Sequence, residues 1–522
     1  MKIWHIKKFF VLFSWVLLLV SCRKDPSWES EYIFPLFQDK LTLHNFFADT
    51  SIKADTDQTA ILVLDQDIIT IMTDTFVDLP DSLYYFKYVL PIGTEVPPNT
   101  LIFTKTESKY FDLGGPELTQ VKLKSGFLYI KAYNYVHDNA YIEYTIENSN
   151  LNGATLKLSG ILPSYPLTGK CLIDSIPVDG VFLDLTPSSH HNNSICSTIK
   201  IYANPYADTN VVVNFNDSIM IVVEFRKTVI DYARGYFGST DLDVEKNNSF
   251  SAIKDLETDY LDLDKITMQL SISNYIGADA IFSIDEFTGT GKQTISLQSP
   301  YIGKNIYMAR AREVTPFTGQ VIPTKVDLDL TNSNIEEFIE NLPHQLYVRM
   351  KAKINPFGNI SSGNDFVYYG SGLNFHMHAE IPLRIAFSNL TLRDTMNYDF
   401  PHTSTIDIKE AQFFINYENS FPIDAQLTLF VLDKNNTVLD SILASQPIQG
   451  GFLDNVTGKV IQPRKGFLKI DLTSPKVATL KQGKKIMVKA QFSTNNGQQK
   501  VRITPESYLL LNIKTNIKTS VE

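Results

Sequence analysis

The clearest candidate for chemistry is the segment His376-Met377-His378-Ala379-Glu380. Alternate residues of a β-strand share one face, so both imidazoles and the carboxylate of Glu380 would point the same way. Neutral imidazole and carboxylate suit zinc or another transition metal. The polar face of a half-buried strand explains the same alternation without a metal. We therefore predict no metal, and retain His376, His378 and Glu380 as the one candidate ligand set.

No other constellation indicates catalysis. The chain has no Gly-x-Ser-x-Gly nucleophile motif and no glycine-rich phosphate loop before a helix. Asp241, Asp243, Glu245 and Asn247 alternate as calcium ligands could, but the glycine that an EF-hand loop requires is missing. We predict that the protein is not an enzyme and uses no cofactor.

Cysteine is rare, with three residues in the whole chain. Cys22 closes an apolar N-terminal run, which leaves Cys171 and Cys196. An exported chain meets an oxidising compartment, where these two could form a disulfide. They could equally be two small buried side chains that never meet. The sequence leaves both alternatives open, because it does not show the geometry that a bridge needs.

The N-terminus has the composition of an export signal. Lys2, Lys7 and Lys8 precede the uncharged run 9–20, which is shorter than the roughly 20 residues of a membrane-spanning helix. Residues 1–21 are therefore predicted to be a signal peptide. Leu19-Val20-Ser21-Cys22 resembles the lipobox of bacterial lipoproteins, which implies that Cys22 becomes the acylated first residue of the mature chain.

The length of the chain indicates how many domains it contains, and its charge limits the kinds of molecule that it can bind. A chain of 522 residues is long enough for about three or four domains. Its formal net charge is −10, and loss of the three signal lysines makes it more negative. Such a chain repels nucleic acid, so no nucleic-acid partner is expected.

The most informative feature is a repeat. Asparagine, an apolar residue two positions later and an alanine six positions later recur between alternating apolar runs. This is the pattern of a β-hairpin with a polar turn. The three copies begin at Asn134, Asn274 and Asn419 and reach Ala140, Ala280 and Ala425. We expect these alanines to be packed rather than exposed, because a small residue begins the returning strand each time.

The repeat predicts an all-β protein of tandem β-sandwich-like units. We place a tether and a β-rich region at 22–114, and units at 115–255, 256–400 and 401–522. One short helix is predicted near 334–342, because Ser333 and Glu336 form a capping box before residues at helical spacing.

Two resemblances follow from these motifs. Cys22, Pro35-Leu36, Leu41-Thr42-Leu43 and the asparagine hairpins resemble large outer-membrane lipoproteins of the Bacteroidetes. The hairpin units are also similar to the β-sandwich of late-embryogenesis-abundant type 2 proteins. The first resemblance implies a lipid-anchored outer-membrane protein, facing either the periplasm or the cell surface. Neither resemblance brings an activity with it.

We expect a non-catalytic accessory or scaffold subunit of a cell-envelope complex. It would contact the bilayer through acylated Cys22 and a protein partner in the outer membrane. The alternative is a lipoprotein that binds a glycan or a lipid. Exposed tyrosines at one end would favour a glycan, a continuous apolar groove a lipid, and a broad apolar patch a protein.

Overall fold

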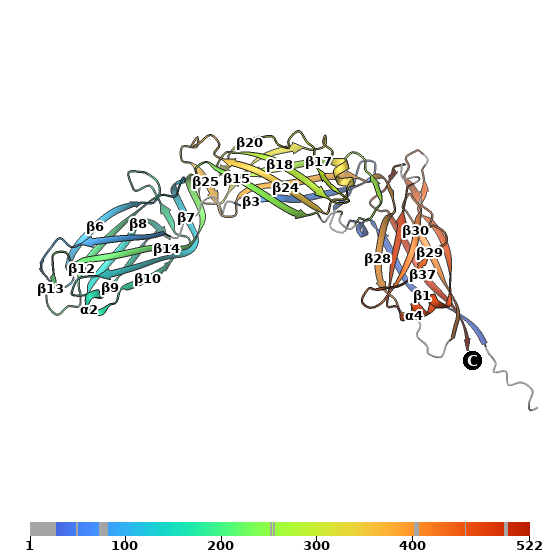
Figure 1. The fold of residues 1–522 in the computed structure, drawn as a ribbon, viewed down its shortest axis with the longest axis horizontal. Coiled ribbons are helices and arrows are strands. Elements are labelled where there is room, and N and C mark those ends of the chain that lie inside the picture. Colours follow the sequence, from blue (N-terminus) through green and yellow to red (C-terminus); the bar gives the residue numbers. More distant parts are fainter. Residues whose placement is uncertain are drawn as a thin grey trace, which may run out of the picture.

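The computed structural model describes residues 28–47, 51–72, 82–250, 253, 256–400, 407–454, 456–494 and 499–521. Most elements in these ranges are β-strands, which confirms the predicted all-β class. The strands build three lobes in a bent row (Figure 1). Among the described residues, no helix has both the length and the apolar character needed to cross a membrane.

The three lobes are nested in the sequence. The terminal lobe comprises residues 28–47 and 389–521, and it contains both ends of the described chain. The middle lobe comprises residues 51–72 and 240–388, and the distal lobe residues 82–238. Each lobe therefore interrupts the sequence of the one before it.

The terminal lobe has two four-stranded sheets. One has the order β1 (Trp28–Thr42), β37 (Tyr508–Val521), β29 (Asp407–Asn419), β34 (Arg464–Leu472). The other has the order β28 (Leu390–Asn397), β35 (Lys485–Phe492), β30 (Ala425–Leu432), β31 (Val438–Leu443). The remaining elements are η1 (Leu43–Asn45), β32 (Phe452–Leu453), β33 (Val460–Gln462), α4 (Ser474–Gln482) and β36 (Val501–Arg502).

The middle lobe pairs two sheets in the same way. One has the order β2 (Ser51–Ala54), β3 (Ala60–Met72), β26 (Gly372–Pro382), β17 (Thr267–Asn274), β23 (Thr324–Asp329). The other contains β15 (Thr240–Ser249), β24 (Gln345–Ile354), β18 (Ala280–Thr290), β19 (Thr294–Ser296) and β20 (Ile306–Met308). The remaining elements are β16 (Tyr260–Asp262), β21 (Arg312–Glu313), β22 (Val321–Ile322), α3 (Ile335–Glu340), β25 (Asp365–Tyr368) and β27 (Arg384–Ser388).

The distal lobe completes the row. One side contains β4 (Ser82–Val89), β14 (Ser218–Tyr236), β7 (Glu117–Asn134) and β10 (Leu172–Pro177). The other contains β6 (Leu101–Tyr110), β12 (Ser194–Ala203), β8 (Ala140–Leu151) and β9 (Ala154–Leu162). The short strand β11 (Phe182–Asp184) pairs with both β7 and β8. The remaining elements are β5 (Thr94–Val96), α2 (Tyr165–Thr168) and β13 (Val211–Val213).

All three lobes share one plan. The predicted hairpins are β7–β8, β17–β18 and β29–β30. The first hairpin strand pairs with the last long strand of its lobe, which is β14, β26 or β37. The second pairs with β12, β24 or β35. Two edge strands complete each lobe, one on either sheet. They are β4 and β6 in the distal lobe, β3 and β15 in the middle lobe, where the four-residue β2 pairs with β3 and extends the sheet by one strand, and β1 and β28 in the terminal lobe.

The edge strands explain the nesting. The middle and distal lobes lie between β1 and β28, and the distal lobe lies between β3 and β15. Between β4 and β6 there is only a loop that contains β5. The described residues of the region predicted at 22–114 are therefore distributed over three lobes rather than forming one of their own. The predicted boundaries at 115, 256 and 401 differ for the same reason, since local sequence patterns carry no signal for pairing between distant strands.

Helices are few. Helix α3 lies within the predicted range 334–342, although its N-cap residue is Asn334 rather than Ser333. Helices α2 and α4 were not predicted. Only Val477 and Leu480 of α4 are buried, so its helical periodicity is weak.

The core follows the predicted alternation. Along β30 and β35, every second side chain is buried between the two sheets of the lobe. Ala140, Ala280 and Ala425 are each buried, which confirms that these turn alanines are packed. Each lies opposite a residue of the neighbouring strand, namely Ala203 of β12, Ile354 of β24 or Phe492 of β35.

Candidate functional site: the tips of the lobes

The repeated asparagines define one end of each lobe, here called the tip. The Nδ2 atom of Asn134 donates to the carbonyl oxygens of Asp138 (2.7 Å) and Leu162 (3.1 Å). Its Oδ1 atom accepts a bond of 2.9 Å from the backbone N–H of Val136. The corresponding partners are Ala278, Ala309 and Ile276 for Asn274, and Ile423, Gln449 and Phe421 for Asn419. All three asparagines are fully buried, so their amides satisfy backbone groups that water does not reach.

A second loop at the tip is also built alike. A four-residue turn precedes the last long strand of each lobe, at 214–217, 368–371 and 504–507. The backbone N–H of its fourth residue donates to the carbonyl of its first, over 3.0–3.1 Å. The N–H of the first residue in turn donates to the side chain of Asp217, Ser371 or Ser507. The short strands β13, β25 and β36 lie just before these turns.

Two of the three tips are docked onto the next lobe. Strand β25 of the middle tip pairs with the end of β14 in the distal lobe. Strand β36 of the terminal tip pairs with β27 in the middle lobe. The tip loops therefore add a strand to the neighbouring lobe, and this pairing fixes one lobe against the next.

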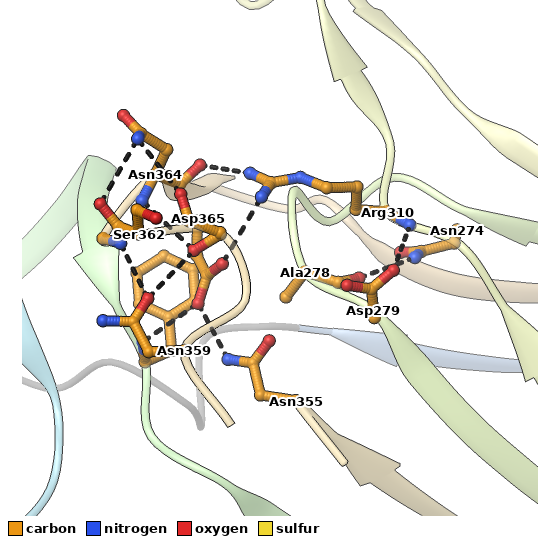
Figure 2. Close-up of polar contacts among 12 residues, drawn as sticks. Asn274, Ala278, Asp279, Arg310, Asn355, Asn359, Ser362, Asn364 and Asp365 are labelled. Carbon is orange, nitrogen blue, oxygen red and sulfur yellow. Dashed lines mark hydrogen bonds and ion pairs between the residues drawn. The ribbon is translucent and has the colours of Figure 1, made fainter. Parts of the chain in front are cut away.

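The middle tip is held to the distal lobe by a buried carboxylate. Asp365 is 1% exposed, and its Oδ2 atom accepts hydrogen bonds from Asn355 Nδ2 (2.8 Å) and the Phe237 N–H (3.2 Å). Phe237 belongs to the segment that leads from β14 back to β15. Arg310 extends toward Asp365, with 3.9 Å between Nη1 and Oδ1, and also donates to the Asn364 carbonyl (Figure 2). The cation lies near the buried charge, which would otherwise be costly.

Aromatic side chains form the rest of this junction. The Phe317 ring of the middle lobe lies between two distal rings, with centroids 5.2 Å from Phe182 and 4.8 Å from Tyr232. Glu313 accepts hydrogen bonds from Arg234 and from the Tyr368 hydroxyl. Burial raises the pKa of Tyr232 to about 12, so its hydroxyl stays protonated while accepting from Arg234 Nε at 2.8 Å. The docked tip thus combines apolar contact with charge pairing.

The terminal tip contacts the middle lobe through a different set of side chains. Asp57 pairs with Arg384 (2.8 Å) and Arg502 (3.2 Å). A hydrogen bond from the Thr59 hydroxyl, together with these guanidinium groups, lowers the pKa of Asp57. A small apolar cavity of about 20 Å³, room for about one water molecule, lies at the same junction. Its lining includes Phe46, Leu62, Leu263, Ile339, Ile385 and Leu390.

The distal tip has no further lobe beyond it (Figure 1). Its strand β13 pairs with β5 of the same lobe. Several apolar side chains on its loops and on α2 face solvent, namely Tyr206 (81% exposed), Phe215 (69%) and Leu167 (65%). Tyr135 and Tyr165 also belong to this tip, and their ring centroids lie 5.5 Å apart. This is the end at which the sequence alone indicated no site.

The predicted ligand set lies on the outer face of the middle lobe. His376, His378 and Glu380 share one face of β26, as predicted from their spacing. Asp65 and Asp67 of the neighbouring β3 bind His376 at 2.5 Å and 2.9 Å, and Asp65 lies 3.4 Å from His378. Burial disfavours the charged imidazole of His376, but the two carboxylates outweigh it and raise its pKa. Within the described ranges, no group of three such side chains has the geometry of a metal site.

The remaining predicted site residues are the three cysteines, of which Cys171 and Cys196 lie apart from each other. Cys22 and its lipobox lie outside the described residues. Cys171 and Cys196 are free, so the disulfide alternative is not formed. Cys171 precedes Leu172, which faces Ala132 near the tip of the distal lobe, whereas Cys196 faces Ser108 on β6. The two thiols therefore lie on different sheets of that lobe.

Sequence reasoning missed the tip surface and the junctions. The tip aromatics lie in loops, where no periodicity marks them, and sequence does not show that a loop lacks a neighbour. One signal was available. Asn204-Pro205-Tyr206 and Asn355-Pro356-Phe357 recur at the equivalent loop, and both aromatic rings are exposed.

Comparison with known proteins adds little. No family model and no curated protein matches the chain. A crystal structure from Parabacteroides distasonis, of a protein provisionally described as secreted, is similar at a TM-score of 0.29 and 10% identity, over 94% of this chain and 99% of that one. A DUF4785 family protein from Legionella pneumophila has a TM-score of 0.09 at 9% identity, over 89% and 94%. Scores this low carry no argument about fold or function.

Proposed function

We propose that this protein is an exported lipoprotein that acts at the outer membrane as a non-catalytic scaffold or accessory subunit. The supporting observation is the position of its ends. Trp28 at the start of β1 pairs with Val521 at the end of β37 in the terminal lobe, while β13 and α2 lie at the far end of the row (Figure 1). An acylated Cys22, six residues before Trp28 in the sequence, would hold the terminal lobe at the bilayer. The distal tip would then lie farthest from the membrane.

The connections between the lobes favour a rigid spacer over a row of domains that move independently. The chain passes twice between neighbouring lobes, because each lobe is inserted in the one before it. A strand pair also joins each neighbouring pair of lobes. Domains joined by one linker move freely by default, and these additional links oppose that motion.

Binding of a glycan or a lipid is the second candidate. The exposed rings of Tyr135, Tyr165 and Tyr206 at one end favour a glycan, which binds by stacking on aromatic faces. The apolar cavity between the terminal and middle lobes is about 20 Å³, which is too small for a lipid chain, so a lipid has no comparable support. Titration with soluble glycans and with fatty acids distinguishes these ligands from a protein partner.

The anchoring part is tested by Cys22→Ala in the full chain. Burying acyl chains contributes about 0.8 kcal/mol per methylene group, and stable anchoring needs more than one chain. We expect the variant in the soluble envelope fraction, and Cys171→Ala, the control, in the membrane fraction. Recovery of Cys22→Ala in the membrane fraction would contradict the proposal. The scaffold part predicts a discrete complex in mild detergent, and a protein that always migrates alone would contradict it.

A further inference from the structure

The distal tip occupies the position at which the other two lobes carry a neighbour. In the terminal and middle lobes, the next lobe is inserted between the two edge strands, at the tip. In the distal lobe the same position holds only the loop between Val89 and Leu101. The distal tip is therefore a docking end without a lobe docked on it.

In the distal lobe, the short strand β5 lies in part of the position that an inserted lobe occupies in the other two lobes. Strand β25 pairs with β14 of the next lobe, and β36 with β27, whereas the equivalent β13 pairs with Thr94–Val96 of its own lobe. Pro91, Pro97 and Pro98 flank β5. Proline on an edge blocks the addition of another strand. The strand edge that β25 and β36 use for docking is thus already paired at this tip, which favours contact through side chains over strand pairing.

Side chains in corresponding loops are less exposed at the docked tip than at the free one: Tyr369 is 46% and Phe317 40% exposed, against 69% for Phe215 and 65% for Leu167. Tyr369, the second residue of the middle-tip turn, lies beneath Lys124 of the distal lobe, with the ammonium 3.1 Å from the ring centroid. Its equivalent in the distal turn is Phe215, which is 69% exposed. Leu167 and Phe317 lie in corresponding loops, five residues after Leu162 and eight residues after Ala309, whose carbonyls the tip asparagines bind. Phe317 packs between two rings of the next lobe, whereas Leu167 faces solvent.

The charged side chains at the two tips indicate which kind of partner surface would be complementary to the distal tip. At the docked middle tip, the carboxylate of Glu313 and the ring of Tyr369 meet Arg234 and Lys124 of the next lobe. The free tip likewise exposes Glu95, opposite Val212 of β13, and Asp208, two residues after Tyr206, against one exposed lysine, Lys170. An aromatic surface with acidic neighbours is complementary to a surface that presents lysine and arginine.

A second copy of this chain does not supply that surface. At the base of the distal lobe, the outer edge of β14 is open beyond β4 and receives β25. In the terminal lobe, β1 pairs along β37 from Tyr508 to Val521 and leaves no such opening. Head-to-tail stacking of copies through the same junction is therefore blocked.

We propose that the distal tip docks onto the end of a β-sheet domain of another protein, one that presents lysine and arginine side chains. The contact is made by Leu167, Tyr206 and Phe215, with Glu95 and Asp208 at its rim. Exposed aromatic residues in a cluster are typical of protein interfaces. This inference rests on the proposed scaffold function, since it names the kind of partner that the scaffold holds.

The test uses a photoreactive benzoylphenylalanine at position 215 of the full, anchored chain in its native cells. The control places the same group at Phe467, an exposed ring of the terminal lobe. We expect one discrete cross-linked protein from position 215 and none from position 467. Mass spectrometry of the cross-link should locate it in a β-sheet domain within a few residues of lysine or arginine.

A charge-reversal variant makes the test specific. Glu95→Lys with Asp208→Lys should lower the cross-link yield about tenfold and leave thermal unfolding unchanged, because both side chains are exposed. A cross-link only to glycan, equal yields at 215 and 467, no product at 215, or a yield unaffected by charge reversal would each overturn the inference. Failure of the anchoring proposal is read separately, from the fractionation of Cys22→Ala.

Discussion

The tips of the middle and distal lobes differ in what their common framework supports. Both close with a buried asparagine and the same four-residue turn. The middle tip carries an entire lobe between its edge strands, and the buried Asp365 ties that lobe in place. The distal tip carries the short strand β5 at the same position and exposes its aromatic rings. One hairpin plan can therefore serve as a junction or as a free end, depending on the loops attached to it.

The largest loss of stability is expected from a variant that disrupts the docked tip. Asp365→Ala removes the acceptor of Asn355 and the Phe237 N–H, and leaves Arg310 without its buried partner. We expect a loss of about 3–5 kcal/mol in the free energy of unfolding, as for other broken buried pairs. Calorimetry should also resolve a separate transition of the distal lobe. Asp208→Ala at the free tip is the control and should change stability by less than about 0.5 kcal/mol. Equal effects of the two variants would contradict the distinction between the tips.

The next effect tests what the tips share. Replacing the buried asparagine by alanine leaves one N–H and two carbonyl groups without partners in every lobe. The expected cost in urea unfolding is about 2–4 kcal/mol for Asn134→Ala, Asn274→Ala and Asn419→Ala alike. A large effect in one lobe and none in the others would show that the three turns are not equivalent.

A smaller effect probes the packing behind each tip. Ala140, Ala280 and Ala425 are buried at the start of the returning strand. Substitution by leucine should overpack each site and cost about 1–3 kcal/mol. Thermal unfolding of the three variants measures this directly, with alanine to serine at the same positions as the size-matched control. Unchanged melting of all three leucine variants would contradict the packing.

The smallest expected effect is a pH dependence of stability that arises at the edge strands of the terminal lobe and not at those of the middle lobe. In the middle lobe, the amides of Gln66 and Asn248 link β3 and β15. In the terminal lobe, Asp39 of β1 faces Asp394 of β28. Burial, and then the charge of Asp394, raise the pKa of Asp39 to about 6. The folded state thus binds this proton more tightly than the unfolded state, and stability falls as pH rises from about 4 through 6.

The corresponding variant is Asp39→Asn, which removes the charge and keeps the shape. We expect a gain of about 1 kcal/mol at pH 8, after allowance for solvent screening at this half-buried site, and little change at pH 4. Urea unfolding at the two pH values measures it. A gain of the same size at both pH values would mean that Asp39 does not titrate in this range.

The sequence predicted the local parts of this fold and not their assembly. The three asparagine hairpins, the packed alanines and the helix near 334–342 all follow from spacing within a few residues. The partners of β1, β3 and β4 do not, because each pairs with a strand more than a hundred residues away in the sequence. Even the shared face of His376 and His378 was predictable, whereas their pairing with Asp65 across strands was not.

The nesting of the lobes is the central claim, and excision tests it most directly. Met72 and Thr240 both lie at the middle tip, opposite Gly372 and Ile354. Replacing residues 73–239 by a flexible glycine–serine linker should leave the middle and terminal lobes folded, with one cooperative urea transition. Removing residues 401–521 instead should destroy the terminal lobe, because β1 loses its partner β37. If the first variant fails to unfold cooperatively while the second still does so with β1 protected from hydrogen exchange, the lobes are not nested as described.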